Sequence, residues 1–238
     1  MHEPPASEPS GALETRAGLW LPITILTRPQ TAFQLIAATG QWLPAYLVIV
    51  ALGLAELYLT APTVEHLVHL SLPAGAAASR AEFHGMVARD FGFEAIWTLA
   101  GPFVLWGFVG ALLWVCAVAA RVETTSFRTY FALCMNCAVP SEIGQFFDAA
   151  ATRLHDPSAF RSTNDVWTVI PASLAALRPH GSTAEIAFLS YWSVFAVWSL
   201  LLLGYGYAAL AKMSLVPALL LVFGIGLVLA LAQVVSTS

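Results

Sequence analysis

Two acidic residues lie inside long apolar stretches of this sequence, where charged side chains are rare. Glu142 follows Pro140 in the stretch CMNCAVPSEIGQFFDA, and Glu56 lies in the stretch LAELYLT. A carboxylate at the centre of a bilayer costs about 2.5–3.5 kcal/mol, and the membrane proteins that keep one there often use it to move ions. The chemistry that these residues could perform is therefore the passage of an ion or a small solute through a membrane.

The polar residues around Glu142 share one side of a predicted helix. Pro140 leaves a backbone carbonyl without its partner, and such a carbonyl attracts polar groups. A spacing of three or four residues puts on one helix face, here called the polar seam, the residues Cys134, Cys137, Ser141, Gln145 and Asp148. Glu142 lies beside the polar seam. In the simpler interpretation these groups satisfy one another's hydrogen bonds between helices; in the other they form, together with Glu56, an intramembrane site for transport.

Glu56 differs from Glu142 in its expected depth. The apolar stretch that contains Glu56 ends near Thr60, so its carboxylate lies one turn before the predicted end of the helix. Acidic and basic side chains at such positions reach the aqueous interface. We therefore expect Glu56 close to the non-cytoplasmic surface and Glu142 buried in the bundle. A role for Glu56 in an ion pathway is the alternative.

Few other residues have the spacing of a catalytic or metal site. Cys134 and Cys137 form a CxxC pair, but inside an apolar helix the pair is better explained as small core residues. His66 and His69 are three residues apart and could share a zinc ion, yet no third ligand is assigned. The sequence contains no P-loop, nucleophile elbow, HExxH motif or dinucleotide fingerprint. We expect no enzyme activity, no metal and no cofactor.

Composition places these residues in a membrane protein. Of the 238 residues, 58% are hydrophobic and only 10% are charged, whereas about 25% are charged in a globular domain, so lipid must cover the apolar surface. A stretch of about 20 apolar residues is long enough to cross a hydrocarbon layer of about 30 Å. We predict an all-α bundle of five transmembrane helices, with the weakest signal in the third, at residues 41–60, 94–120, 128–149, 188–210 and 213–235.

The segments before and between these spans have other expected roles. Residues 1–18 are rich in Pro, Ser and Glu and are predicted to form a disordered tail. The stretch from 19 to 40 mixes apolar and polar residues and is predicted to lie on the bilayer surface as an interfacial segment. Small residues four apart let helix backbones approach closely, and two such pairs are Gly107 with Ala111 and Gly204 with Ala208.

Basic residues near the short connections set the predicted orientation. Arg121, Arg128 and Lys212 lie at the two short connections, and Arg28 precedes the first span. Basic residues in short loops favour the cytoplasmic side, and an odd number of spans then puts the C-terminus on the opposite side. A formal net charge of -4 leaves no basic surface for nucleic acid. The expected partners are the lipid bilayer and other membrane proteins or further copies of this chain.

Three stretches carry a family resemblance. They are ILTRPQTAFQLIAATGQWLPAYLVIVAL, SFRTYFALCMNCAVPSEIGQFF with Pro140, and FLSYWSVFAVWSLLLLGYGYAALAKMSLVPALLLV with Trp198, Gly204 and Lys212. Together they resemble the Yip1 domain family of five-span membrane proteins, and the short N-terminal tail is similar to that of prokaryotic members. The start of the fourth span departs from the family pattern, because it has Phe188 and the residues Leu-Ser-Tyr where Asp-Pro-Phe is expected. The resemblance implies a protein of the bacterial cytoplasmic membrane.

These observations lead to one expected function and one alternative. We expect a non-catalytic integral membrane protein of the Yip1 type that acts in membrane organisation or in the assembly of a membrane complex. The alternative is a small transporter or channel that uses the polar seam around Glu142. A continuous polar path from Glu142 and Glu56 to water would favour transport, whereas exposed small-residue or apolar faces would favour assembly.

Overall fold

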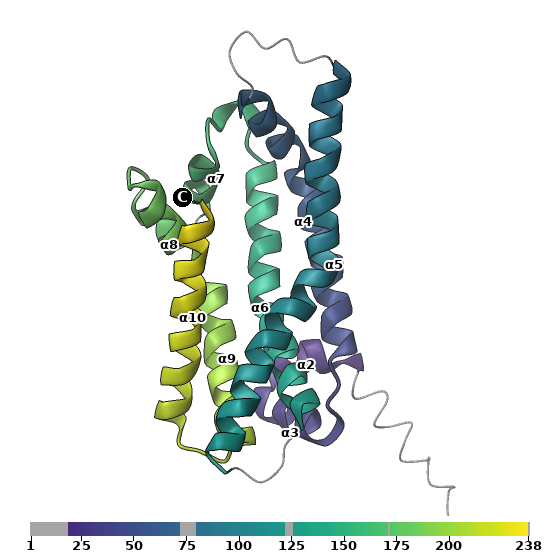
Figure 1. The fold of residues 1–238 in the computed structure, drawn as a ribbon, viewed down its shortest axis with the longest axis vertical. Coiled ribbons are helices and arrows are strands. Elements are labelled where there is room, and N and C mark those ends of the chain that lie inside the picture. The colour runs from purple at the N-terminus through teal and green to yellow at the C-terminus, as the bar shows by residue number, and fades with distance from the viewer. Residues whose placement is uncertain (1–18, 72–79, 122–125, 171, 238) are drawn as a thin grey trace, which may run out of the picture.

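Helices make up nearly all of the chain. The structure is a computed structural model, and it describes residues 19–71, 80–121, 126–170 and 172–237. Within these ranges the chain is all-α, as predicted, and no strand is present; the predicted tail lies outside the described residues. Five long helices run along the longest axis of the molecule (Figure 1). They are α4 (Leu43–Ser71), α5 (Arg80–Ala119), α6 (Phe127–Arg153), α9 (Val194–Leu210) and α10 (Leu215–Thr237).

Three stretches within these helices are long and apolar enough to cross a membrane, namely Leu43–Leu70, Phe83–Ala119 and Leu215–Val235. They indicate an integral membrane protein, so this part of the prediction is confirmed. α9 is also apolar but has only 17 residues. α6 has 27 residues and carries charged side chains, among them Glu142. The number of five spans therefore stays a prediction.

α6 lies at the centre of the bundle, where it contacts α4, α5 and α9. Every residue from Thr129 to Pro140 is buried. Because its neighbours shield it, α6 could lie within a membrane without being apolar on all sides. This explains why the third predicted span has the weakest signal in the sequence.

α4 and α5 are longer than the first two predicted spans. α4 continues through Pro62 to Ser71, although the first span was expected to end near residue 60, and α5 begins at Arg80 rather than near residue 94. With 40 residues, α5 is about 60 Å long, roughly twice the thickness of the hydrocarbon layer. The predicted ends are those of the apolar stretches, and they stay a prediction for the membrane spans, because a helix can continue into water with polar residues.

The predicted fourth span, residues 188–210, is not one helix. α8 (Thr183–Tyr191) ends two residues before α9 starts, and Ser193 is the N-cap of α9. Across the break, the backbone N–H of Leu174 donates a hydrogen bond to the carbonyl of Trp192. A distant segment thus pairs with backbone groups that a continuous helix would have paired internally.

The segment before the first span forms two short helices, α2 (Leu21–Thr27) and α3 (Pro29–Thr39). They pack against α6, and α3 also contacts α9. Apolar side chains that were expected to face a bilayer surface, such as Ile25, are instead buried in the protein core. Gly40 ends α3 in the left-handed conformation, and its carbonyl accepts a hydrogen bond from Nε of Arg128 at 3.2 Å.

The two ends of the bundle carry different elements (Figure 1). The end here called the basic end contains α2, α3 and the α9–α10 connection, and its basic residues are Arg28, Arg121, Arg128 and Lys212. The opposite end, here called the loop end, contains α8 and three short helices, η1 (Pro157–Ala159), α7 (Thr163–Val169) and η2 (Leu174–Leu177). α4 runs from the basic end towards the loop end, and α5 runs back.

Candidate solute-binding cavity

A cavity of about 710 Å³ lies between α4, α5 and α6. Its lining extends along α4 from Ile49 to Val64 and along α5 from Arg89 to Trp106. Side chains of α6 complete the wall. Pockets of roughly 300–1,000 Å³ are the usual size for small-molecule ligands, so the cavity is large enough for a solute.

The cavity brings the two acidic residues of the apolar stretches together. Glu56 from α4 and Glu142 from α6 both line it, and their charges lie close enough to repel each other. Glu56 was expected one turn before the end of its helix. Because α4 continues to Ser71, Glu56 lies near the middle of this helix instead. Its side chain lines the cavity together with that of Glu142 and does not lie at the end of the helix.

Two more acidic residues, Asp90 and Glu94 of α5, also line the cavity. Glu94 is close enough to Glu56 for their charges to interact. Among the described residues of the lining, Arg89 is the single basic one, and its Nε lies 3.6 Å from Oδ1 of Asp90. Since the acidic residues outnumber this one arginine, the lining favours a positively charged ligand.

The outer end of the cavity lies towards the loop end. Arg89 is 79% exposed in its side chain, and it lies in the half of α5 nearer the loop end. Val64 lines the same part of the cavity from α4. Polar residues of the lining thus lead from Glu56 to exposed positions at this end.

The inner end of the cavity lies against a cluster of aromatic rings. Trp42 packs edge-on to Phe103 with 5.3 Å between ring centroids, and Tyr46 lies 4.5 Å from Phe103. Phe131 of α6 stacks on Phe103 at 6.0 Å. The hydroxyl of Tyr46 donates a hydrogen bond to the carbonyl of Leu99 at 3.2 Å, which ties α4 to α5. We call Trp42, Tyr46, Phe103 and Phe131 the aromatic cluster.

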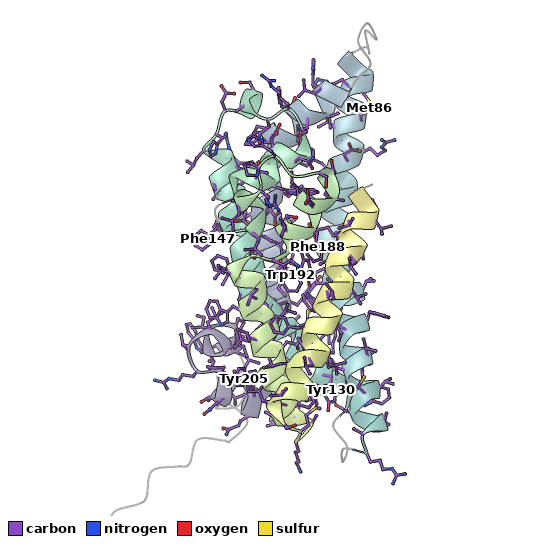
Figure 2. All side chains as sticks on the ribbon, turned by 90° about the vertical axis from the view of Figure 1, so that its left-hand side faces the viewer. Met86, Tyr130, Phe147, Phe188, Trp192 and Tyr205 are labelled. Carbon is purple, nitrogen blue, oxygen red and sulfur yellow. The ribbon has the colours of Figure 1, made fainter. Side chains whose placement is uncertain are left out.

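Between the aromatic cluster and the basic end the bundle is well packed. Tyr130 and Tyr207 are buried with ring centroids 5.8 Å apart. Figure 2 shows Tyr130 near the basic end and Met86 of α5 near the opposite end. The cavity spans the middle of α4 and α5 and extends towards the loop end, since its lining runs from Ile49 and Trp106 to Val64 and Arg89.

The polar seam is divided between the core and the cavity. Cys134 and Cys137 are buried in the hydrophobic core. The backbone N–H of Ser141 donates to the hydroxyl oxygen of Ser199 on α9 at 3.0 Å, so a neighbouring helix supplies a polar partner next to Pro140. Gln145 lines the cavity. Asp148 is half-buried, and its charge interacts with that of Glu56.

Asn136 is a further polar residue of α6, and the sequence pattern did not single it out. It is 0% exposed, and its Nδ2 donates to the carbonyls of Gln41 at 3.0 Å and Ala132 at 2.8 Å. The first of these bonds joins α6 to the segment between α3 and α4. An asparagine inside an apolar helix was the available signal, because such residues often hydrogen-bond across helices.

No family model, curated protein or solved structure matches this chain. The resemblance to the Yip1 domain family therefore stays a prediction. Function has to be inferred from the cavity and from the helix contacts.

The glycines predicted to pack helices differ in their surroundings. A Cβ atom at Gly204 would lie 2.5 Å from Cδ2 of Leu219, so α9 and α10 approach closely there, and Ala208 packs against the same core. At Gly107 no atom lies within 4 Å of such a Cβ, and Ala111 is half-buried. α5 instead approaches α6 at Gly110, where an added Cβ atom would lie 3.1 Å from Cα of Phe131. Within this chain the close approach of α5 is at Gly110 rather than at Gly107.

The histidines of the first long connection lie on helices. His69 of α4 packs edge-on to Phe83 of α5 at 5.7 Å, and His84 lies beside the same ring at 5.9 Å. In the part of the chain that the structure describes, no three His, Cys, Asp or Glu side chains are grouped so that they could hold a metal ion.

Proposed function

We propose that this chain is a five-span integral membrane protein of the Yip1 type. Its cavity binds a cationic solute, which passes through the cavity into the membrane. The observation that supports this most is that Glu56 and Glu142, from two different helices, line one cavity. Carboxylates of intramembrane cavities commonly mark ion and substrate pathways. Transport was the alternative function predicted from the sequence. It requires a polar path from Glu56 and Glu142 to water, and the polar residues of the cavity lining support such a path.

Five spans are supported by the arrangement of α6 and α9. α6 is surrounded by α4, α5 and α9, so its polar residues need not face lipid. α9 is short for a span, but α8 precedes it after a break of two residues. The broken backbone is hydrogen-bonded to the segment at Ala172 and Leu174, and non-helical segments paired with protein in this way are tolerated inside membranes.

A cytoplasmic N-terminus is supported by the basic end. Arg28, Arg121, Arg128 and Lys212 belong to elements that meet at this one end (Figure 1). Basic residues of short connections favour the cytoplasmic side. In this orientation the cavity opens away from the cytoplasm, and the aromatic cluster separates it from the cytoplasmic half.

A flux measurement tests the proposal. The full chain is reconstituted in proteoliposomes, and uptake of radiolabelled tetramethylammonium is followed with the loop end outside. Glu142→Gln and Glu56→Gln should each lower the uptake rate about tenfold or more, since each removes a charge that attracts the cation. Glu65→Gln is the matched control, because Glu65 lies on α4, is exposed and does not line the cavity. Uptake that is absent, or equal in all four proteins, would contradict the proposal.

Assembly of a membrane complex is the second candidate, and one observation favours it. At Gly107 and Gly224 no atom lies within 4 Å of the position that a Cβ atom would take, so neither small residue is used for packing inside the chain. Such positions let a helix of another protein, or of a second copy, approach closely. Chemical crosslinking in native membranes tests this: Gly107→Leu should abolish a crosslinked product, while Leu47→Phe, an exposed position on α4, should not.

A further inference from the structure

The cavity has two chemically different parts. Towards the loop end its lining carries the acidic residues, with Glu56, Glu94 and Glu142 closest to the middle. Towards the aromatic cluster the lining is apolar, with Ile49, Leu105 and Trp106. A ligand that fits both parts must have a positive charge at one end and an apolar group at the other.

Resting on the proposed function, we propose that the solute is a hydrophobic amine or quaternary ammonium compound. Its ammonium group lies between Glu56, Glu94 and Glu142, and its alkyl or aryl group points towards the aromatic cluster. The proposal names the class of ligand and its direction in the cavity.

An aromatic side chain at the acidic part supports an organic cation. Trp97 lines the cavity one turn from Glu94 on α5. Tryptophan is the strongest partner for an ammonium group over its ring face, and this interaction adds to the attraction of the carboxylates. A hydrated metal ion would gain nothing from the apolar part, and a phosphate-bearing lipid headgroup would be repelled by the acidic residues.

The apolar part limits the length of the ligand. From Glu56 to Ile49 along α4 there are seven residues, which span roughly 10 Å at about 1.5 Å per residue. An extended alkyl chain with bonds of about 1.5 Å advances about 1.25 Å per carbon, so about eight carbons fill this part. At the inner end, Ile49 and Trp106 pack together with residues of the aromatic cluster, so we expect this end to stop a longer chain.

A homologous series of ligands tests the proposal. Binding of alkyltrimethylammonium ions with one, four, eight and twelve carbons in the alkyl chain is measured on the full chain in nanodiscs, below their micelle concentrations. Empty nanodiscs correct for partition into lipid. We expect affinity to rise about fourfold for each buried methylene, up to about eight carbons, and then to level off or fall.

Substitutions in the lining test whether the rise in affinity with alkyl chain length comes from binding in the cavity. Leu105→Trp fills the apolar part, so the ratio of the octyl to the methyl affinity should fall at least tenfold. Ile49→Phe, which fills the same apolar part from α4, serves the same purpose if Leu105→Trp does not fold. Leu47→Trp is the matched control, because Leu47 is 56% exposed on α4 outside the cavity, and it should keep the ratio of the unsubstituted protein.

The outcomes separate this inference from the proposed function. If tetramethylammonium binds in a manner that depends on Glu142 but chain length changes nothing, the amphiphilic ligand is wrong and cation binding stands. If the ratio of affinities is the same in Leu105→Trp and Ile49→Phe as in the unsubstituted protein, the direction of the ligand is wrong. If no member of the series binds, both the inference and the proposed function are wrong.

Discussion

Alanine at position 144 should force α6 and α9 apart. A Cβ atom at Gly144 would lie 2.6 Å from Cβ and 2.7 Å from Cγ of Phe195. The backbone fixes the position of Cβ of Phe195, so a rotamer change can move Cγ but not Cβ, and the backbone of α9 has to shift. Phe195 also stacks on Phe147 of α6 at 6.2 Å, which restricts that shift.

The size of the effect follows from overpacking. Inserting a methyl group into a well-packed contact typically costs about 1–3 kcal/mol. For a chain of this length each kcal/mol lowers the melting temperature by about 2–4 °C, so Gly144→Ala should melt about 2–12 °C below Gly107→Ala, which gains the same helix propensity without the close contact. The assay is thermal unfolding of the full chain in mild detergent, followed by tryptophan fluorescence.

Gly107→Ala is the matched control for this prediction. It adds the same methyl group to α5, where no atom lies within 4 Å of it. Alanine favours a helix over glycine by up to about 1 kcal/mol, so this variant should melt at the same temperature or up to about 4 °C higher. Equal melting temperatures for Gly144→Ala and Gly107→Ala would refute the close α6–α9 contact.

Three further predictions concern hydrogen bonds. Asn136→Ala removes the donor to the Gln41 carbonyl and should lower the free energy of unfolding by about 1–3 kcal/mol, measured by denaturant titration; no change would contradict the role of this buried bond. Ser199→Ala removes the hydroxyl that accepts a hydrogen bond from the N–H of Ser141 and should lower the free energy of unfolding by about 1 kcal/mol in the same titration, whereas Ser199→Thr keeps the hydroxyl and should lower it less. The N–H and hydroxyl of Ser182 hold the pKa of Glu185 below its ordinary value. The stabilisation of the start of α8 by Glu185 is therefore present above that ordinary pKa and is lost as the pH falls through the lowered one. An NMR titration should give a Glu185 midpoint below that of an unstructured peptide, and an equal midpoint would contradict the capping contact.

The helical class and the last span could be predicted from apolar stretches alone. The predicted span at 213–235 differs from α10 by two residues at each end, because this helix is apolar throughout and begins after a turn at Lys212, which has positive φ. The break before α9 could not be predicted in this way. The break depends on the hydrogen bond from the N–H of Leu174 to the carbonyl of Trp192. Hydropathy carries no information about which distant segment makes such a bond.

The candidate site could be predicted in its residues but not in its geometry. Glu142, Gln145 and Glu56 were singled out because they are polar in apolar surroundings, and all three line the cavity. Their meeting depends on the length of α4, since a helix that ended near residue 60 would leave Glu56 at its end. The contributions of Asp90 and Glu94 were missed for the same reason, because both lie in the part of α5 that was expected to be loop or near its start.

Pro140 lies where α6 changes its surroundings. On its basic-end side, every residue back to Thr129 is buried, and Asn136 bonds to the segment before α4. On its loop-end side, Glu142 and Gln145 face the cavity. A proline removes one backbone hydrogen bond from a helix, and the adjacent N–H of Ser141 is paired with α9 instead of resting on α6 alone. The two parts of α6 therefore meet at the point where the helix lacks one of its own hydrogen bonds, and the contact with Ser199 on α9 fixes this point one residue before Glu142.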